Sequence, residues 1–270
     1  MADQDVTASG QAPDTTLDRF LDGRVAALQP RRGRHRAGTD AVLLAASVPV
    51  DAHGTIVDLG AGVGVAGLCV ARLRPAVRVV LVDCDTTVTA LANDSLALAE
   101  NGDLAARVSV VEADILAREA ERVAAGLLPG MASHVIMNPP FHEPGTVRAS
   151  PDAARAFAHV LSDEGLEGWM RTAASLLAGG GRISVIWPAD RLSALLVAME
   201  GRFGGLGLYP LFPAADRPAI RVLASGIKGS RGPLRLMPGL VLHDEGGRFS
   251  PAAERAMRAG ELIGAERFFG

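Results

Sequence analysis

The stretch Val57-Asp58-Leu59-Gly60-Ala61-Gly62-Val63-Gly64 decides the fold of this chain. An apolar run ends in three closely spaced glycines, and the helical pattern Gly64–Leu73 follows at once. Glycines let the backbone turn tightly and let a ligand approach the main chain. The start of a helix offers free N–H groups to a carboxylate or a phosphate. The stretch therefore predicts a strand, a sharp turn and a helix, with a ligand site at the turn.

From residue 55 onward, short β-rich runs alternate with helical patterns. Some runs, such as Ile183–Trp187, are almost wholly apolar, which is typical of strands covered on both faces. The alternation predicts an α/β fold with a doubly wound, mainly parallel, seven-stranded sheet. The predicted strands are Thr55–Leu59, Arg78–Asp83, Arg107–Glu112, His134–Asn138, Arg182–Trp187, Gly207–Phe212 and Ile220–Gly226. The predicted helices are Gly64–Leu73, Thr87–Glu100, Asp163–Ala178 and Arg191–Arg202, with an earlier one capped by Thr39.

The spacing of the glycines argues against a nicotinamide-binding site. Dinucleotide-binding turns favour a G-x-G-x-x-G pattern, whereas here Gly64 follows Gly62 after one residue and Val65 stands where that pattern requires Gly or Ala. Asp58 also lies two residues before Gly60, where its charge would repel a pyrophosphate. The same charge suits a ligand with a cationic amino-acid end.

This glycine turn resembles motif I of the class I S-adenosylmethionine (SAM) methyltransferases. The resemblance implies that Asp58, with the glycines, holds the methionine part of SAM. Asp83 ends the second predicted strand, where an acid can accept hydrogen bonds from ribose hydroxyls. Asp114 follows the third, where the family places an acid beside the adenine ring. The alternative is that these two acids only cap helices or end strands.

The fourth predicted strand ends in Asn138-Pro139-Pro140-Phe141, followed by His142. The exocyclic amine of a base is a poor nucleophile, because its lone pair is delocalised into the ring. The Asn138 side-chain oxygen and the Pro139 carbonyl can each accept one N–H of such an amine and aim its lone pair at a methyl group. The two prolines stiffen the backbone that presents these acceptors.

The same string resembles motif IV of the amino-directed methyltransferases, written Asn/Asp/Ser-Pro-Pro-aromatic. Phe141 then offers a face on which a flipped or unpaired base can stack. His142 either contacts the substrate or faces solvent. The alternative interpretation of the whole string is an ordinary turn that ends a strand.

The charge of the chain is uneven. It holds 27 basic and 30 acidic residues, which excludes a uniformly basic nucleic-acid-coating protein. Residues 23–38, however, contain five arginines and no acid. This basic segment is either a solvated arm or an arm that binds phosphates. The residues proposed to contact phosphates are Arg31, Arg32, Arg34 and Arg36.

The segment from Leu28 to Leu44 resembles the N-terminal signature of the bacterial tRNA1(Val) (adenine-N6)-methyltransferase-like family. The resemblance covers roughly residues 22–226, including the glycine turn, the Asn-Pro-Pro-Phe string and the glycine turn of 177–181. It implies a SAM-dependent enzyme that methylates an adenine amine in tRNA, with Asp40 near SAM and the arginines on the RNA side. The better-known members of that family carry Tyr where this chain has Phe141, followed by His142. The Asn-Pro-Pro-Phe-His string also resembles the rRNA guanine-N2 methyltransferases, which are one alternative. The others are a protein-glutamine N5 methyltransferase and a SAM-binding RNA-binding protein without turnover.

The remaining features bound the organisation and location of the chain. The two cysteines, Cys69 and Cys84, show no metal-ligand spacing, so no metal is expected. No apolar stretch reaches the roughly 18 residues that a membrane span needs, and the expected location is the cytoplasm. We expect a disordered tail (1–22), a basic arm with a helix (23–50), the methyltransferase domain (51–228) and a C-terminal extension (229–270) holding a hairpin and a helix. The oligomeric state stays open.

Overall fold

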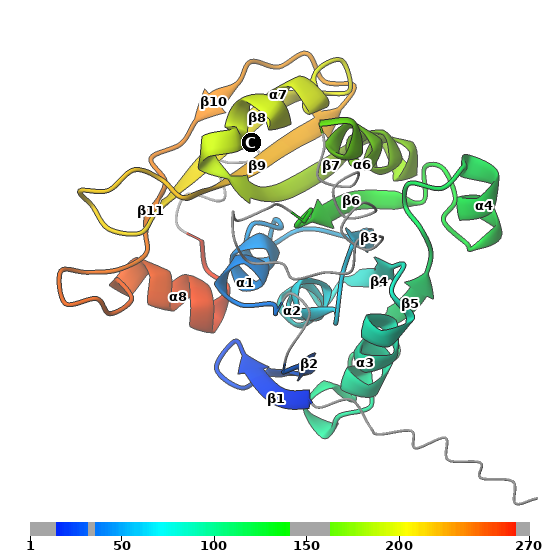
Figure 1. The fold of residues 1–270 in the computed structure, drawn as a ribbon, viewed down its shortest axis with the longest axis horizontal. Helices are drawn as coiled ribbons and strands as arrows, with labels where there is room; N and C mark the ends of the chain where they lie inside the picture. Colours follow the sequence, from blue (N-terminus) through cyan, green and yellow to red (C-terminus); the bar gives the residue numbers. More distant parts are fainter. Residues whose placement is uncertain (1–14, 32–35, 141–162, 263–270) are drawn as a thin grey trace, which may run out of the picture.

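The computed structural model describes residues 15–31, 36–140 and 163–262 and places one large sheet at the centre of the molecule (Figure 1). Its strands are β3 (Gly54–Leu59), β4 (Val77–Asp83), β5 (Val108–Glu112), β6 (Ala132–Met137), β7 (Leu177–Pro188), β8 (Phe203–Phe212), β9 (Arg221–Lys228), β10 (Arg235–Leu236) and β11 (Leu240–Val241). The strand order is β10-β8-β9-β7-β6-β3-β4-β5, and β11 also pairs with β8. Strands β3 to β7 are mutually parallel, whereas β9 runs antiparallel to both β7 and β8.

The predicted doubly wound, mainly parallel sheet is confirmed, and all seven predicted strands form. Strand β3 lies between β4 and β6, so the chain first builds outward to one side of β3 and then returns to build on the other. Ligands bind beyond the carboxyl ends of the strands at such a reversal. The topology therefore places the glycine turn after β3 and the Asn-Pro-Pro string after β6 side by side.

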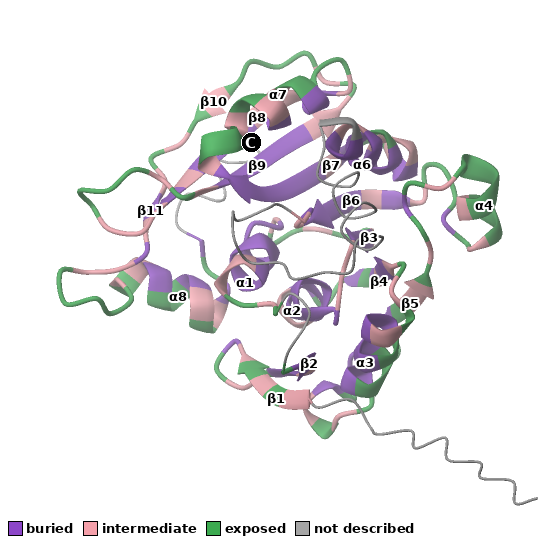
Figure 2. Ribbon diagram, viewed as in Figure 1, coloured by how far each residue is buried: buried purple, intermediate pink, exposed green. Residues whose placement is uncertain are grey.

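Helices cover both faces of the sheet. Their bounds are α1 (Thr39–Ala46), α2 (Val65–Leu73), α3 (Thr86–Leu96), α4 (Glu119–Ala124), α6 (Asp163–Leu176), α7 (Leu192–Met199) and α8 (Pro251–Ala259). Helices α1, α2 and α3 lie on one side and α6 and α7 on the other (Figure 1), and the buried residues gather between these layers and the sheet (Figure 2). Alternate side chains of β3 enter separate cores, because Ile56 packs with the α1–α2 side and Val57 with the α6 side.

The predicted disordered tail is wrong for its last part, because β1 (Thr15–Phe20) pairs antiparallel with β2 (Val25–Pro30). The polar sequence of β1 gives no strand signal, because the buried side chains of the hairpin belong to β2. The hairpin packs on the helical layer through Asn101, whose amide donates to the Ala26 carbonyl at 2.6 Å, and through Ser95, which accepts from the Leu28 N–H at 2.9 Å. Residues 1–14 lie outside the described residues.

Three smaller expectations also need correction. Gly38, and not Thr39, is the N-cap of α1. Helix α3 ends at Leu96, and a separate 3-10 turn spans Ala99–Asn101, because the chain bends there to bring Asn101 against the hairpin. In the C-terminal extension, β10 and β11 do not pair with each other: each pairs parallel with β8, so they continue the central sheet, and the antiparallel pairing lies further on, where His243 bridges to Phe249 across a tight turn. The predicted C-terminal helix forms as α8.

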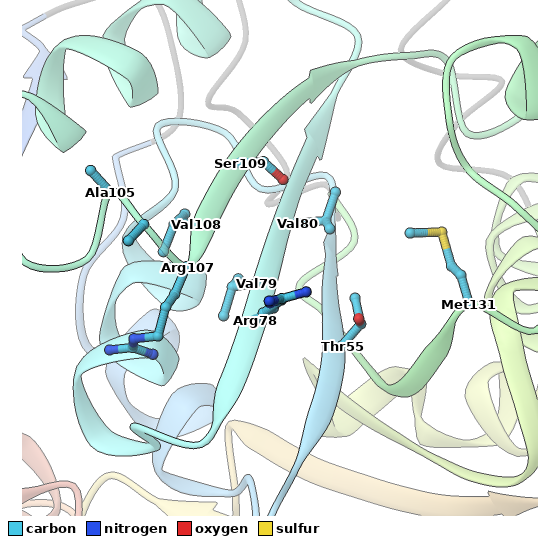
Figure 3. Close-up of a pocket in the computed structure, with 10 residues that line it drawn as sticks. Thr55, Arg78, Val79, Val80, Ala105, Arg107, Val108, Ser109 and Met131 are labelled. Carbon is cyan, nitrogen blue, oxygen red and sulfur yellow. The ribbon is translucent and has the colours of Figure 1, made fainter.

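The amino-terminal edge of the sheet holds a pocket that is separate from the ligand edge (Figure 3). Arg78, Ser109 and Met131 are among its lining residues, and they stand near the starts of β4, β5 and β6. Within the ranges given above, no helix is long and apolar enough to cross a membrane.

A buried histidine makes the stability of the sheet depend on pH. The His134 ring lies between β6 and β7 with Nε2 3.0 Å from the Ser184 hydroxyl. Burial, assisted by the charge of Arg182, lowers the pKa of His134 to about 3. The unfolded chain therefore binds a proton near pH 6.5 that the folded chain excludes, so stability falls as the pH drops below that value.

We predict that His134→Asn flattens this acid dependence. Between pH 6 and pH 4 the wild type should lose up to about 1.4 kcal/mol per pH unit from this residue, and the variant should not. Urea unfolding at pH 7, 5.5 and 4.5 measures the difference. His53→Asn, at an exposed position, is the matched control. Parallel pH profiles for His134→Asn and the wild type would show that His134 does not carry the effect.

Candidate functional site

The glycine turn after β3 has the conformation that only glycines adopt at low cost. Gly60, Gly62 and Gly64 have φ values of 67°, 56° and 86°, all in the left-handed region. The Ala61 N–H donates to the Val82 carbonyl at 2.9 Å, which ties the turn to the end of β4. The turn is therefore a rigid link between two strand ends and the start of α2.

Asp58, near the end of β3, holds the glycine turn in place through a hydrogen bond to α2. Its carboxylate accepts a hydrogen bond from the Gly67 N–H in the first turn of α2 at 2.8 Å, and only 2% of the residue is exposed. Burial raises the pKa of the Asp58 carboxyl to about 7, the Gly67 N–H lowers it, and the charge of Asp83 raises it. A cationic ligand beside this carboxyl would favour its charged form, because the cation offsets the cost of burial.

The two other predicted acids follow neighbouring strands at the same edge. Asp83 is half-buried, and its carboxylate accepts the N–H groups of Gly62 and Asp85 at 2.8 and 3.0 Å. Asp114 is exposed and accepts the Leu116 N–H at 2.8 Å. Both acids thus accept hydrogen bonds from nearby backbone N–H groups, as the alternative interpretation of a purely structural role predicts. Each carboxylate still has free lone pairs, so these bonds do not prevent contact with a ligand.

The Asn-Pro-Pro string lies directly beside the glycine turn. Leu59 pairs with Met137 in the parallel ladder, so the next residues, Gly60 and Asn138, are neighbours at the edge. The Asn138 side-chain oxygen is buried and has no hydrogen-bond partner among the described residues. Pro139 is buried and Pro140 is half-buried. An acceptor without a partner at this position is available to an N–H donor from a ligand. Phe141 and His142 lie outside the described residues.

Trp169 of α6 belongs to this site, although the sequence analysis did not single it out. A Cβ built on Gly60 would lie only 2.3 Å from the ring carbon Cη2 of Trp169, so the indole supports the turn at contact distance. Its Nε1–H is buried and, like the Asn138 oxygen, unpartnered in the described part of the chain. No sequence signal marks it, because one tryptophan in an amphipathic helix is typical of a core residue.

Asp40, predicted to lie near SAM, forms an ion pair that the sequence did not suggest. The Arg221 Nε, at the start of β9, lies 3.1 Å from an Asp40 carboxylate oxygen, and both side chains are partly exposed. Strand β9 starts opposite Pro188, at the carboxyl end of β7. The pair therefore joins α1 to the sheet on the ligand edge. Asp40 and Arg221 are 181 residues apart, so no local pattern could reveal them.

The described arginines of the predicted arm, Arg31 and Arg36, form hydrogen bonds to the β1–β2 hairpin. Arg36 forms an ion pair with Asp18 at 2.6 Å and donates to the Pro30 carbonyl, while Arg31 donates to the Thr15 carbonyl at 3.2 Å. Both arginines are exposed residues. The predicted phosphate contacts of Arg32 and Arg34 lie outside the described residues.

Gln29 fastens the start of α1 to the hairpin. Its amide oxygen accepts the Ala37 N–H at 2.7 Å, and its amide nitrogen donates to the Ala37 carbonyl at 3.0 Å and to Asp18 at 2.7 Å. The residue is fully buried. This exchange of bonds imitates a β-ladder and positions the chain just before Asp40.

The fold and this edge define a class of protein, the SAM-dependent methyltransferases. Within that class, the chain belongs to the methyltransferase small domain family, whose model matches residues 34–204. The methyl donor of the enzyme is SAM. The described ranges contain no group of three or more His, Cys, Asp or Glu side chains placed to hold a metal ion.

Several relatives carry a more specific name. The chain is 28% identical over 233 residues to the tRNA1(Val) (adenine(37)-N6)-methyltransferase of Dickeya chrysanthemi, an alignment that covers 83% of this chain and 86% of the relative. It is 31% identical over 164 residues to the protein of that name from Porphyromonas gingivalis, covering 59% of this chain and 61% of the relative. The chain therefore spans less than two thirds of the second relative.

A solved structure supports the fold independently. The Agrobacterium tumefaciens protein Atu636, described as a predicted O-methyltransferase, superposes with a TM-score of 0.70 at 34% sequence identity. The match covers 83% of this chain and 97% of that protein.

The residues present at this edge fit SAM. A Cβ on Gly62 would meet no atom within 4 Å, so the turn faces open space at that point. The edge also combines the buried carboxyl of Asp58 with the half-buried carboxylate of Asp83 and the exposed carboxylate of Asp114, which suits a ligand with an ammonium group and ribose hydroxyls.

We predict that the wild type loses stability as the pH rises toward 7 because of Asp58, and that Asp58→Asn removes this loss. The folded protein holds a proton on Asp58 up to about pH 7, whereas the unfolded chain releases it near pH 4. The stabilising contribution of the protonated form is therefore complete below about pH 4 and disappears as the pH rises through 7. The contribution of Asp58 to wild-type stability should fall by up to about 1.4 kcal/mol per pH unit in this window, and the comparison with Asp58→Asn separates it from the opposite contribution of His134.

The measurement is urea unfolding of the cofactor-free protein at pH 5, 6.5 and 8. The asparagine keeps an acceptor for the Gly67 N–H, and its stability relative to the wild type should improve as the pH rises. Asp51→Asn, at an exposed site, is the control. A constant difference between Asp58→Asn and the wild type would contradict the assignment.

We predict that alanine at Gly60 and at Gly62 has different consequences. At Gly60 the methyl group collides with Trp169, so the variant should lose several kcal/mol of stability or fail to fold. At Gly62 only backbone strain arises, costing roughly 1–2 kcal/mol, and the methyl group enters the open side of the turn. Gly62→Ala should therefore stay folded and lose SAM affinity. Thermal unfolding and calorimetry measure both effects, and equal melting temperatures for the two variants would refute the contact with Trp169.

Proposed function

We propose that this protein transfers a methyl group from SAM to the 6-amino group of an adenine in tRNA. The observation that carries the proposal is the buried, unpartnered side-chain oxygen of Asn138 beside the glycine turn. Leaving such an acceptor unpaired costs about 1–3 kcal/mol, so its retention points to a donor on the substrate. The names of the relatives indicate adenine in tRNA1(Val), position 37, as the substrate.

The chemistry follows from the acceptors that end β6. The Asn138 oxygen accepts one N–H of the adenine amine and the Pro139 carbonyl accepts the other, which directs the nitrogen lone pair out of the ring plane. When bound, SAM supplies an electrophilic methyl on a sulfonium leaving group. No strong base is needed, because the product loses its proton after transfer. Pro140 stiffens the string and Phe141 stacks on the base. The rate then comes mostly from alignment.

The cofactor contacts are assigned to the acids and glycines of the edge. Asp58 sets the turn, and Gly60, Gly62 and Gly64 let the methionine part approach the main chain. Asp83 accepts the ribose hydroxyls through lone pairs that its backbone bonds leave free. The two remaining contacts are Asp114 beside the adenine and Asp40, held by Arg221, near the amino-acid end.

The RNA side is assigned to the start of the chain. The proposed phosphate contacts are Arg31, Arg32, Arg34 and Arg36, with His142 near the target base. Arg36 is partly neutralised by Asp18, so a phosphate would have to share its guanidinium group with that carboxylate. A tRNA substrate would place the enzyme in the cytoplasm.

The experiment that tests the proposal is incubation of the protein with SAM carrying a labelled methyl group and with tRNA that lacks the modification. Digestion to nucleosides and mass spectrometry identify the product. The expected product is N6-methyladenosine. N2-methylguanosine would replace the proposal by the guanine alternative, and a 2′-O-methylated nucleoside would favour the chemistry named for the Agrobacterium protein.

We predict that Asn138→Ala lowers methyl transfer at least about 100-fold, as expected for removing a preset hydrogen-bonding group at the reacting atom. SAM affinity measured by calorimetry should change little, since the glycine turn is untouched. Asn93→Ala, on the exposed face of α3, is the control and should transfer methyl groups normally. Loss of SAM binding together with transfer would contradict this division of roles.

A further inference from the structure

The ion pair between Asp40 and Arg221 joins two distant parts of the chain at the ligand edge. The Arg221 Nε donates to Asp40 Oδ2 at 3.1 Å, and the side chains of Arg221 and Asp40 are 20% and 26% exposed. Arg221 is the first residue of β9 and pairs in the sheet with Pro188, the last residue of β7. An ion pair between partly exposed side chains adds little to stability. The position of this pair therefore indicates a role in the site.

Helix α1 places Asp40 at the level of the glycine turn. Directly after α2, the buried Arg74 donates through Nε to the carbonyls of Val48 and Pro49, just beyond the end of α1, at 3.0 and 2.9 Å. The two helices lie side by side (Figure 1), and they lead into β3 and β4, which run parallel. With eight residues in α1 and nine in α2, helices that end together also start together. The first turn of α1 therefore lies at the edge where the glycine turn starts α2.

The ion pair orders a side chain on a helix that is otherwise fixed. Residues Ala41–Ala46 of α1 are all buried, and Asp40 is the only charged residue of the helix. The bond to Arg221 restricts the rotamer of Asp40 and uses one of its carboxylate oxygens, while the carboxylate keeps lone pairs for an N–H donor of a ligand. A carboxylate that is already ordered loses less entropy when a ligand binds, which favours affinity.

We propose that Arg221 is a positioning residue of the cofactor site, which holds the Asp40 carboxylate in place for the ammonium group of SAM. This inference rests on the proposed contact of Asp40 with the amino-acid end of SAM, and it adds the residue that orients that contact. Arg221 acts through Asp40 and does not itself touch the cofactor. Ligands with an amino-acid end should therefore depend on Arg221, and ligands without one should not.

The experiment compares two ligands that differ in this end alone. S-adenosylhomocysteine is SAM without the transferred methyl group, and 5′-methylthioadenosine has a methyl group in place of the amino-acid chain. Calorimetry measures the Kd of each ligand for the wild type, Asp40→Asn, Arg221→Gln and the double variant. For S-adenosylhomocysteine, Asp40→Asn should weaken binding at least about tenfold, the size of a charged hydrogen bond. Arg221→Gln should weaken it about three- to tenfold, the cost of ordering one side chain.

The affinity for 5′-methylthioadenosine should be unchanged in all variants. The double variant should bind S-adenosylhomocysteine no more weakly than Asp40→Asn, because Arg221 acts only through Asp40. Asp103→Asn is the matched control, since it breaks the ion pair with Arg72 at 2.7 Å in the last turn of α2, at the opposite end of that helix from the glycine turn. This control should keep the wild-type affinity for both ligands.

Two results would overturn the role of Arg221. One is an Arg221→Gln variant whose affinities for the two ligands change by the same factor or not at all. The other is a double variant whose loss is the product of the two single losses, because Arg221 would then act independently of Asp40. If Arg221→Gln lowers the melting temperature, the ratio of the two affinities still decides, since partial unfolding weakens both ligands equally. RNA takes no part in these measurements, so a wild type that binds both ligands but methylates no tRNA would overturn the proposed substrate and leave this inference intact.

Discussion

The hydrogen bond from the Gly67 N–H to the buried Asp58 carboxylate is the constraint on which the functional edge depends. It joins the end of β3 to the first turn of α2 and so restricts the conformation of the glycines between them. That conformation carries Gly62 to Asp83 at the end of β4 and brings Gly60 against Trp169. Because burial makes the charged form of Asp58 costly, the same interaction couples the shape of the turn to proton uptake and to any cation bound nearby.

Two of the four buried side-chain polar atoms that lack a hydrogen-bond partner among the described residues belong to residues around this turn. Ser184, Trp187 and Gln29 all have partners for their buried polar atoms. The Asn138 oxygen and the Trp169 N–H have none among the described residues, and the same holds for the Thr16 hydroxyl of β1 and the Arg72 Nε of α2. An unpaired acceptor reduces stability, so the Asn138 oxygen at the carboxyl end of β6 suits a site that is complementary to a polar ligand.

The sequence predicted what depends on local patterns. All seven strands follow from short apolar runs between helical patterns, and the positions of Asp58 and Asn138 follow from strands that end there. The first strand, β1, escaped prediction because Thr15–Phe20 are polar and gain stability from pairing with β2 and from the Asp18–Arg36 ion pair. The apolar run of the C-terminal extension forms no hairpin of its own because β10 and β11 pair with β8, more than twenty residues upstream, and only the short turn from His243 to Phe249 pairs antiparallel.

By itself, the sequence determined the class of fold, the glycine turn and the identity of the acceptor that ends β6, because each depends on residues adjacent in the chain. Only the tertiary structure decided which distant groups complete the edge. Arg221 meets Asp40 across 181 residues, and Trp169 reaches Gly60 from a helix on the opposite face of the sheet from α2. Such pairings arise from the order of strands and the packing of layers, and a periodic pattern carries no information about either.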